Sequence, residues 1–184
     1  MLGAHQRLSQ LLVTHLKELN GETLRYASGD VVIEENENAN DILLVLSGEL
    51  SVEISSQREL ARIKPGNMIG EMGLFGNNRH CATVRVHRGP AEIIRVNADD
   101  LIRLALFDSD LAFEMLALSS ERCRKGNQLN LVLLDSIQAL YEGNRSQLQK
   151  CLNQLETEAG GFQGAAKQLA SINGRLLKPS STKK

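Results

Sequence analysis

The chain between residues 24 and 97 is a succession of short apolar or alternating runs, and this pattern restricts the fold more than any other feature. The runs are GDVVIEE (29–35), DILLVLSGELSVEIS (41–55), RELARIKPG (58–66) and CATVRVHRGPAEIIRV (81–96). Runs of this kind are typical of β-strands, and we expect turns at 47–48, 64–66 and 88–90, where glycine occurs. Because almost no helical repeat intervenes, the pattern predicts an antiparallel barrel or jelly-roll of about eight strands.

Helical periodicity flanks this β-rich segment on both sides. Five leucines and a histidine share one side of a helix at 8, 11, 12, 15, 16 and 19, and Asn97 is a candidate N-cap for the helices that follow. The predicted fold is therefore α+β, an antiparallel β jelly-roll with flanking N-terminal and C-terminal α-helices. We expect residues 1–126 to form one domain with its roll at about 24–97, residues 127–176 a helical extension, and residues 177–184 a disordered tail.

The charge balance excludes an obvious polyanion-binding protein. The chain of 184 residues has 21 basic and 22 acidic side chains, a formal net charge of −1. This balance gives no basic footprint for nucleic acid or for an anionic membrane. The N-terminus reads as an amphipathic helix without a cleavage site, and no segment approaches the length of a membrane span. We therefore expect a cytoplasmic protein.

The reactive side chains show no catalytic or metal-binding arrangement. Cys81, Cys123 and Cys151 lie far apart, and the four histidines add no ligand spacing, so we predict no metal and a reducing compartment. Ser47 has no histidine partner that the sequence reveals, and the thiols are interpreted as structural. The protein is not expected to be an enzyme.

One segment, IGEMGLFGNNRHCATV (69–84), interrupts the strands with a single helical turn. A turn of this kind presents free backbone N–H groups, as phosphate-binding loops do. Glycine at 70 and 73 allows the backbone to approach a ligand closely. Glu71 stands at the start of the turn, where the helix dipole favours a carboxylate. The segment is the candidate anion-binding site of the chain.

Three segments together resemble the cyclic nucleotide-binding domain of Crp/Fnr-type regulators and of the regulatory subunits of cyclic-AMP-dependent kinase. They are EENENANDILLVLSGELSV, IKPGNMIGEMGLF and ATVRV, and the resemblance covers about residues 5–130. It implies a cyclic nucleotide as ligand, with cyclic AMP the first choice and cyclic GMP or a cyclic dinucleotide left open. By the resemblance, Gly70, Glu71, Met72 and Gly73 line the phosphate and ribose, Glu71 accepts the ribose 2′-hydroxyl, and Cys81 and Ala82 give backbone contacts.

The chain departs from the family at the cation that meets the phosphate. The family's arginine stands two residues before the alanine of the exit strand, and here that position is His80 rather than Arg79. Histidine is charged only part of the time near neutrality. Three outcomes are open: Arg79 reaches in, His80 binds the phosphate weakly and with pH dependence, or the site has lost its ligand. Asn36 replaces a turn glycine, and Asn127 stands near the family's base-contacting positions.

These observations favour a cyclic-nucleotide-responsive regulatory module that signals through its C-terminal helices to a protein partner. The alternative is a degenerate, ligand-free domain that serves as a scaffold for dimerisation or docking. A DNA-binding transcription factor is disfavoured, because residues after 126 lack a recognition-helix pattern and are poor in basic side chains.

The resemblance also implies a homodimer formed through residues 109–140, where Leu129, Leu133, Ile137 and Leu140 make an apolar stripe. A second stripe follows at Leu148, Leu152 and Leu155. The alternative is that the two stripes fold back on the roll, or on each other as a hairpin with its bend at 142–144.

Overall fold

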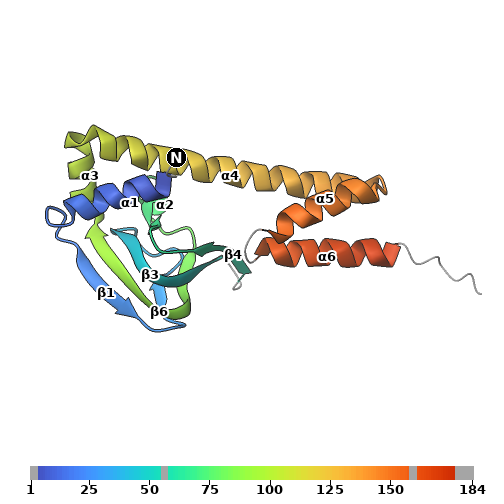
Figure 1. Ribbon diagram of the computed structural model, residues 1–184, viewed down its shortest axis with the longest axis horizontal. Helices are drawn as coiled ribbons and strands as arrows, with labels where there is room; N and C mark the ends of the chain where they lie inside the picture. The colour runs from blue at the N-terminus through green and yellow to red at the C-terminus, as the bar shows by residue number, and fades with distance from the viewer. Residues whose placement is uncertain (1–3, 55–57, 158–160, 177–184) are drawn as a thin grey trace, which may run out of the picture. The chain divides into compact units, whose positions relative to one another are not determined.

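The computed structural model describes residues 4–54, 58–157 and 161–176, so the predicted tail at 177–184 lies outside the described residues. The chain divides into two compact units, Met1–Cys123 and Arg124–Lys184. Figure 1 shows the elements. In chain order they are α1 (Ala4–His15), β1 (Glu22–Tyr26), β2 (Val31–Ile33), β3 (Asp41–Ile54), β4 (Arg58–Ile63), β5 (Met68–Ile69), α2 (Glu71–Leu74), β6 (Thr83–Asn97), α3 (Ala98–Phe107), α4 (Ser109–Tyr141), α5 (Arg145–Glu156) and α6 (Gly161–Leu176).

The first unit contains an antiparallel sheet of six strands among the described residues, in the order β1-β6-β3-β4. Strand β2 pairs with β6, and β5 pairs with β3. Strands β3 and β6 pair from Asp41 opposite Asn97 to Glu53 opposite Thr83, and they form the long central ribbons of Figure 1. The predicted antiparallel roll with flanking helices is therefore confirmed.

The turns predicted at 47–48 and 88–90 are wrong, because the chain bends there without reversing. Both points lie inside β3 and β6, where the ladder shifts register between Val45 and Leu50. Gly48 has φ +87°, and a Cβ at this position would lie 2.7 Å from the Cβ of Ala91. A bulge of this kind bends a strand without ending it. Two long bent strands therefore stand where the sequence suggested several short ones.

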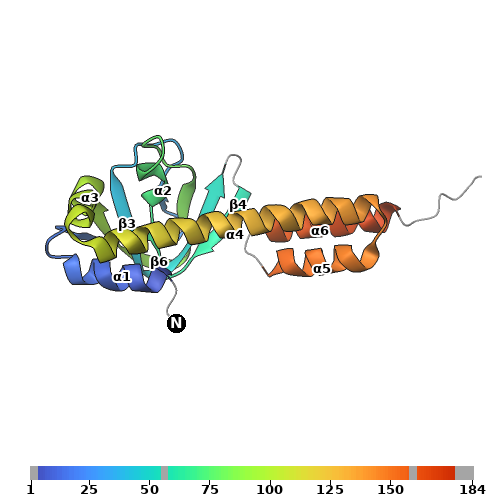
Figure 2. The same cartoon turned by 90° about the horizontal axis from the view of Figure 1, so that it is seen from above.

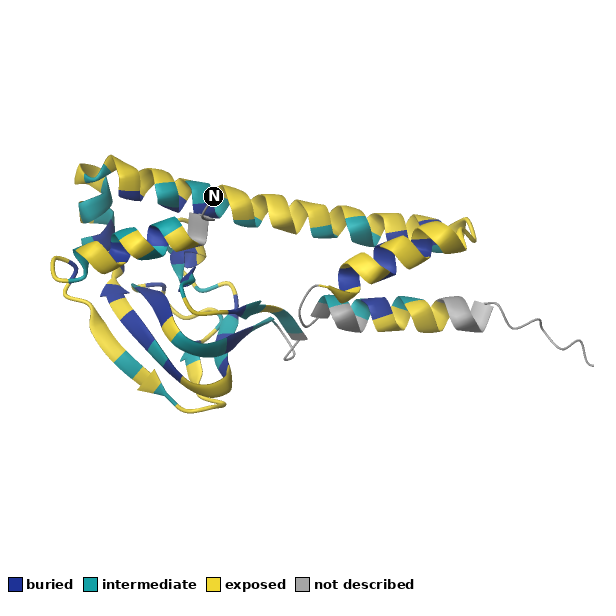
Figure 3. Ribbon diagram, viewed as in Figure 1, coloured by how far each residue is buried: buried dark blue, intermediate teal, exposed yellow. Residues whose placement is uncertain are grey.

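The sheet separates two apolar clusters, as the alternation of side chains along β3 requires. Ile42 and Leu44 face a cluster with α1, α3 and the start of α4, whereas Leu43 and Val45 face the interior of the roll. Figure 2 shows these three helices over the sheet, and Figure 3 shows the buried positions along the strands. The helix cluster consists of Leu8, Leu12, Leu19, Ile42, Leu44, Met68, Ile94, Val96, Leu101, Leu111, Met115 and Leu118.

The second unit is built from the end of α4 with α5 and α6. Its core consists of Ala139, Leu148, Leu152, Leu155 and Ala166, with Leu129, Leu133 and Leu140 packed against it. The chain bends at 142–144, where Gly143 has φ +68° and the side chain of Asn144 caps α5 by accepting from the backbone N–H of Gln147 at 3.1 Å.

The apolar stripe on α4 therefore packs largely within this unit, as the hairpin alternative predicted, while Ile137 stays 59% exposed. No helix in the described part of the chain is long and apolar enough to cross a membrane.

Candidate functional site

The candidate site is the segment 69–82, which we call the cassette. Gly70 has φ +99°, and a Cβ there would lie 2.8 Å from the carbonyl oxygen of Asp41. A Cβ on Gly73 would lie 2.6 Å from the Cβ of Ala39 and 2.7 Å from the carbonyl oxygen of Arg79. Real Cβ atoms do not approach so closely, so both positions require glycine. Gly70 packs the cassette against the first residues of β3, and Gly73 packs it against the loop that precedes β3.

Glu71 is the buried polar residue of the cassette, with a relative exposure of 1%. Its Oε1 accepts a hydrogen bond from Nη1 of Arg122 on α4. The second guanidinium nitrogen, Nη2, donates to the carbonyl oxygen of Met68 at 2.5 Å. Among the residues that the structure describes, Oε2 of Glu71 has no hydrogen-bond partner. A buried acceptor without a partner is costly and requires an explanation, and a ligand that donates a hydrogen bond would supply one.

Arg122 was not among the residues that the sequence predicted for the site. The spacing of buried residues along α4 nevertheless indicates that Arg122 has a buried partner. Leu111, Met115 and Leu118 are buried on the face that packs on the domain, and Arg122 continues their spacing of three and four residues. A charged side chain on a buried helix face indicates a buried partner of opposite charge.

The two candidate cations take different positions. Arg79 is exposed, and its Nη1 donates to the backbone carbonyl of Asn36 at 2.6 Å. His80 is half-buried, and its Cε1 lies 3.7 Å from the position of a Cβ on Gly70. Burial lowers the pKa of His80, although the carboxylates of Glu37 and Asp41 oppose this shift. The imidazole that adjoins the cassette is therefore mainly neutral at pH 7.

The other predicted site residues differ in exposure and in the unit to which they belong. Met72 is 57% exposed, Cys81 is exposed, and Ala82 is buried where the chain enters β6. The structure therefore brings Gly70, Glu71, Gly73 and His80 together, with 81–82 next in the chain. Asn127 is an exposed residue of α4 that belongs to the second unit, so its contact with a base stays a prediction. Asn36, at the turn-glycine position, has φ +70°.

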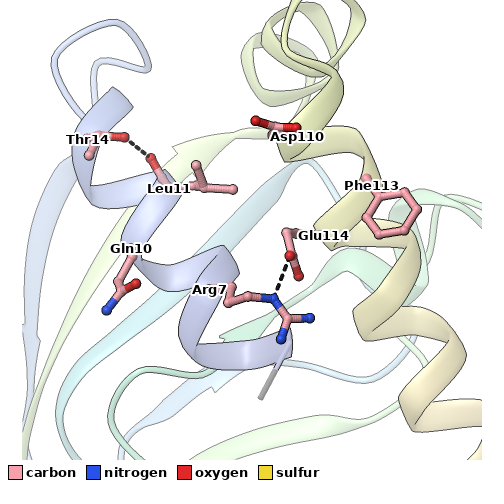
Figure 4. A pocket seen from close by; sticks show the side chains of 7 residues that line it. All are labelled: Arg7, Gln10, Leu11, Thr14, Asp110, Phe113 and Glu114. Carbon is pink, nitrogen blue, oxygen red and sulfur yellow. Dashed lines mark hydrogen bonds and ion pairs between the residues drawn. The ribbon is translucent and has the colours of Figure 1, made fainter. Parts of the chain in front are cut away.

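A pocket of about 350 Å³ lies elsewhere in the first unit, between α1 and the start of α4. Its best-defined contact joins Nε of Arg7 to Oε1 of Glu114 at 2.5 Å, as Figure 4 shows. None of the predicted site residues lines it. Within the described ranges, no three His, Cys, Asp or Glu residues come together to hold a metal ion. The lining residues are Arg7, Gln10, Leu11, Thr14, Asp110, Phe113 and Glu114.

Comparison with known proteins agrees with the resemblance read from the sequence. Residues 23–106 match the family model described as the cyclic nucleotide-binding domain. A transcriptional regulator of Thermotoga maritima is similar in structure, with a TM-score of 0.58 and 23% identity over 67% of this chain and 96% of that chain. The sensor domain of the transcriptional regulator DNR from Pseudomonas aeruginosa has a TM-score of 0.55 and 23% identity, covering 64% and 92%. At such identities the structures show a shared fold. No curated protein sequence matches significantly.

Proposed function

Because residues 23–106 match the model of the cyclic nucleotide-binding domain family, we propose that this chain is a regulatory module that binds a cyclic nucleotide at the cassette. In this proposal the C-terminal helices pass the state of the site to a protein partner. Cyclic AMP is the first candidate ligand, followed by cyclic GMP and cyclic dinucleotides.

The observation that carries the proposal is the buried carboxylate of Glu71 with its Oε2 unpartnered among the described residues. An ionised carboxylate only accepts hydrogen bonds, so the group that completes it must be a donor. A ribose hydroxyl is such a donor, and the family pattern places the ribose at this glutamate. A ligand-free scaffold would leave this oxygen unpaired, at a cost in folding free energy.

The phosphate is assigned to His80 rather than Arg79 in this proposal. The imidazole of His80 lies against Gly70, whereas the guanidinium of Arg79 is engaged with the Asn36 carbonyl. Since only the protonated imidazole attracts a phosphate, and burial lowers its pKa, affinity should rise as the pH falls from 8 towards 5.5. An affinity that is independent of pH over this range would favour Arg79 as the cation.

Calorimetric titration with cyclic AMP, cyclic GMP and cyclic dinucleotides tests the function directly. We expect one of them to bind, and Glu71→Ala to weaken that binding by about 1–3 kcal/mol, the scale for a charged partner left unpaired. Glu34→Gln is the matched control, since it removes an exposed carboxylate of the first unit outside the cassette. If no nucleotide binds the wild-type chain, the ligand-free scaffold becomes the better account.

We also propose that the chain self-associates through α4, on a face that shares only Ile137 with the predicted stripe. The residues of this face recur at alternating spacings of three and four, all are exposed, and none is charged. The spacing of three and four is that of a coiled coil; the apolar members stand at both ends of the series, and asparagine in its middle favours a defined register. The series is Phe113, Leu116, Ser120, Cys123, Asn127, Asn130, Leu134, Ile137 and Tyr141.

Light scattering tests the proposed homodimer on the intact chain at tens of micromolar. We expect a dimer for the wild type and a monomer for the Leu134→Glu/Ile137→Glu variant. Gln128→Glu/Gln154→Glu introduces the same charge at exposed positions outside the series and should stay dimeric. A monomeric wild-type chain would refute the proposed homodimer.

A further inference from the structure

The pocket between α1 and the start of α4 has the side chains of a second binding site, separate from the cassette. We propose that it binds a small organic ammonium ion, such as a linear diamine or polyamine, between the carboxylates of α4 and the facing side of α1. The pocket measures about 350 Å³ and is lined by residues of the first unit alone. This volume lies within the range of small-molecule sites. The site does not depend on the proposed binding of a cyclic nucleotide.

The carboxylate of Glu114 gives the best evidence for a ligand in this pocket. Its Oε1 accepts from Nε of Arg7 at 2.5 Å, as Figure 4 shows. Its Oε2 is buried and has no hydrogen-bond partner among the residues that the structure describes. An ionised carboxylate only accepts hydrogen bonds, so the group that completes it must be a donor. The terminal torsion of glutamate is soft, and a rotation about it turns Oε2 towards the pocket that the side chain lines.

The other polar groups of the pocket also favour a ligand that is positively charged and donates hydrogen bonds. Asp110 stands four residues before Glu114 on α4, so the two carboxylates share one face of the helix. Like charges at this spacing repel each other, and a cation bound between them offsets the repulsion. On α1, the hydroxyl of Thr14 donates to the carbonyl oxygen of Leu11 at 2.6 Å, so it offers lone pairs to a ligand.

The charge and the apolar surface of the lining distinguish between classes of ligand. Arg7 balances only one of the two lining carboxylates, so an anion such as a phosphate would meet an excess of negative charge. Phe113 also lines the pocket and is 68% exposed. The face of an aromatic ring attracts an ammonium group, and its apolar surface suits the methylene chain that joins two amines. The lining therefore fits an alkylammonium ion better than an inorganic cation.

Calorimetric titration of the full chain with 1,4-diaminobutane and with spermidine tests the site. Tetramethylammonium is the control ligand, because it is a cation without N–H donors. We expect both amines to bind, and tetramethylammonium to bind at least about tenfold more weakly, the scale of one hydrogen bond to a charged group.

Substitutions of the two carboxylates locate the bound amine. Glu114→Gln should lower amine affinity about tenfold, and Asp110→Asn should lower it by a smaller factor because Asp110 is exposed. Glu34→Gln is the matched control, since it removes an exposed carboxylate of the first unit outside the pocket and should leave the affinity unchanged. Phe113 is kept in every variant because it also belongs to the proposed dimer face.

Two results would overturn the proposal. Neither amine binds the wild type at millimolar concentration, or tetramethylammonium binds as tightly as the amines and Glu34→Gln loses as much affinity as the pocket variants. Circular dichroism checks that each variant folds, and Asp110→Asn, which leaves the ion pair of Arg7 with Glu114 in place, tests the site if Glu114→Gln does not fold. A wild-type chain that binds amines but no cyclic nucleotide would support this site and refute the proposed function.

Discussion

The tight packing of Gly73 allows a quantitative test of the cassette geometry. In Gly73→Ala the new Cβ would meet the Cβ of Ala39 at 2.6 Å and the carbonyl oxygen of Arg79 at 2.7 Å. Ordinary contacts begin at 3.4 Å, so Ala39 must move away by about 0.8 Å and the Arg79 carbonyl, inside the cassette, by about 0.7 Å. Part of this displacement falls on backbone atoms, which cannot change rotamer. We expect a loss of about 1–3 kcal/mol in the free energy of unfolding, as for overpacked cores.

Urea unfolding followed by circular dichroism measures this loss, with the midpoint and slope compared between variants. Gly126→Ala is the matched control, because Gly126 lies inside α4 and a Cβ there meets nothing within 4 Å. This control should gain about 0.5–1 kcal/mol from helix propensity alone. Nucleotide affinity should fall in Gly73→Ala and stay unchanged in Gly126→Ala. If Gly73→Ala is as stable as the wild type, the close packing of the cassette is wrong.

Three further predictions follow from the same structure. Burial lowers the pKa of His80, so the neutral imidazole contributes to stability above its ordinary pKa of 6.5, and this contribution is lost as the pH falls. The urea midpoint of His80→Asn should therefore fall less between pH 7.5 and 5.5 than that of the wild type. Asp108 accepts from the backbone of Leu111 at 3.1 Å and contacts His15 at 3.0 Å, so Asp108→Ala should lower the melting temperature more at pH 7 than at pH 3. Gly48→Ala, with a Cβ 2.7 Å from that of Ala91, should cost about 1–3 kcal/mol in urea unfolding.

The sequence predicts those parts of the fold that depend on local patterns. Alternating runs specify the strands, and Asn97 caps α3 as expected, since its side chain accepts from the backbone N–H groups of Asp99 and Asp100. Gly70 and Gly73 were expected to allow a ligand to approach, and the structure shows that they also let the cassette pack against Ala39 and Asp41, at the start of β3. Gly48 and Gly89 were wrongly predicted to lie in chain-reversing turns, because a glycine with positive φ occurs in β-bulges as well as in turns.

The contacts that could not be predicted join residues far apart in the chain. Glu71 and Arg122 are 51 residues apart. The helical spacing of α4 places Arg122 on the buried face, but nothing local to it identifies Glu71 as its partner. The contact of Arg79 with Asn36 likewise depends on where the cassette meets the loop before β3. The stripe on α4 was visible, but whether it met a second copy or α5 depended on the bend at Gly143, which directs the chain back onto it.

The position of Arg122 indicates how occupancy of the site could reach α4. A ligand shifts a conformational equilibrium only if it interacts differently with the two states. Glu71 belongs to the cassette and Arg122 to α4, and their ion pair is a direct charged contact between the two elements. A donor that completes the Glu71 carboxylate would fix the group that Arg122 binds, and so would act on the contact of α4 with the cassette. The helix that carries this arginine also carries the exposed heptad series, so one element would both sense the nucleotide and bind the second copy.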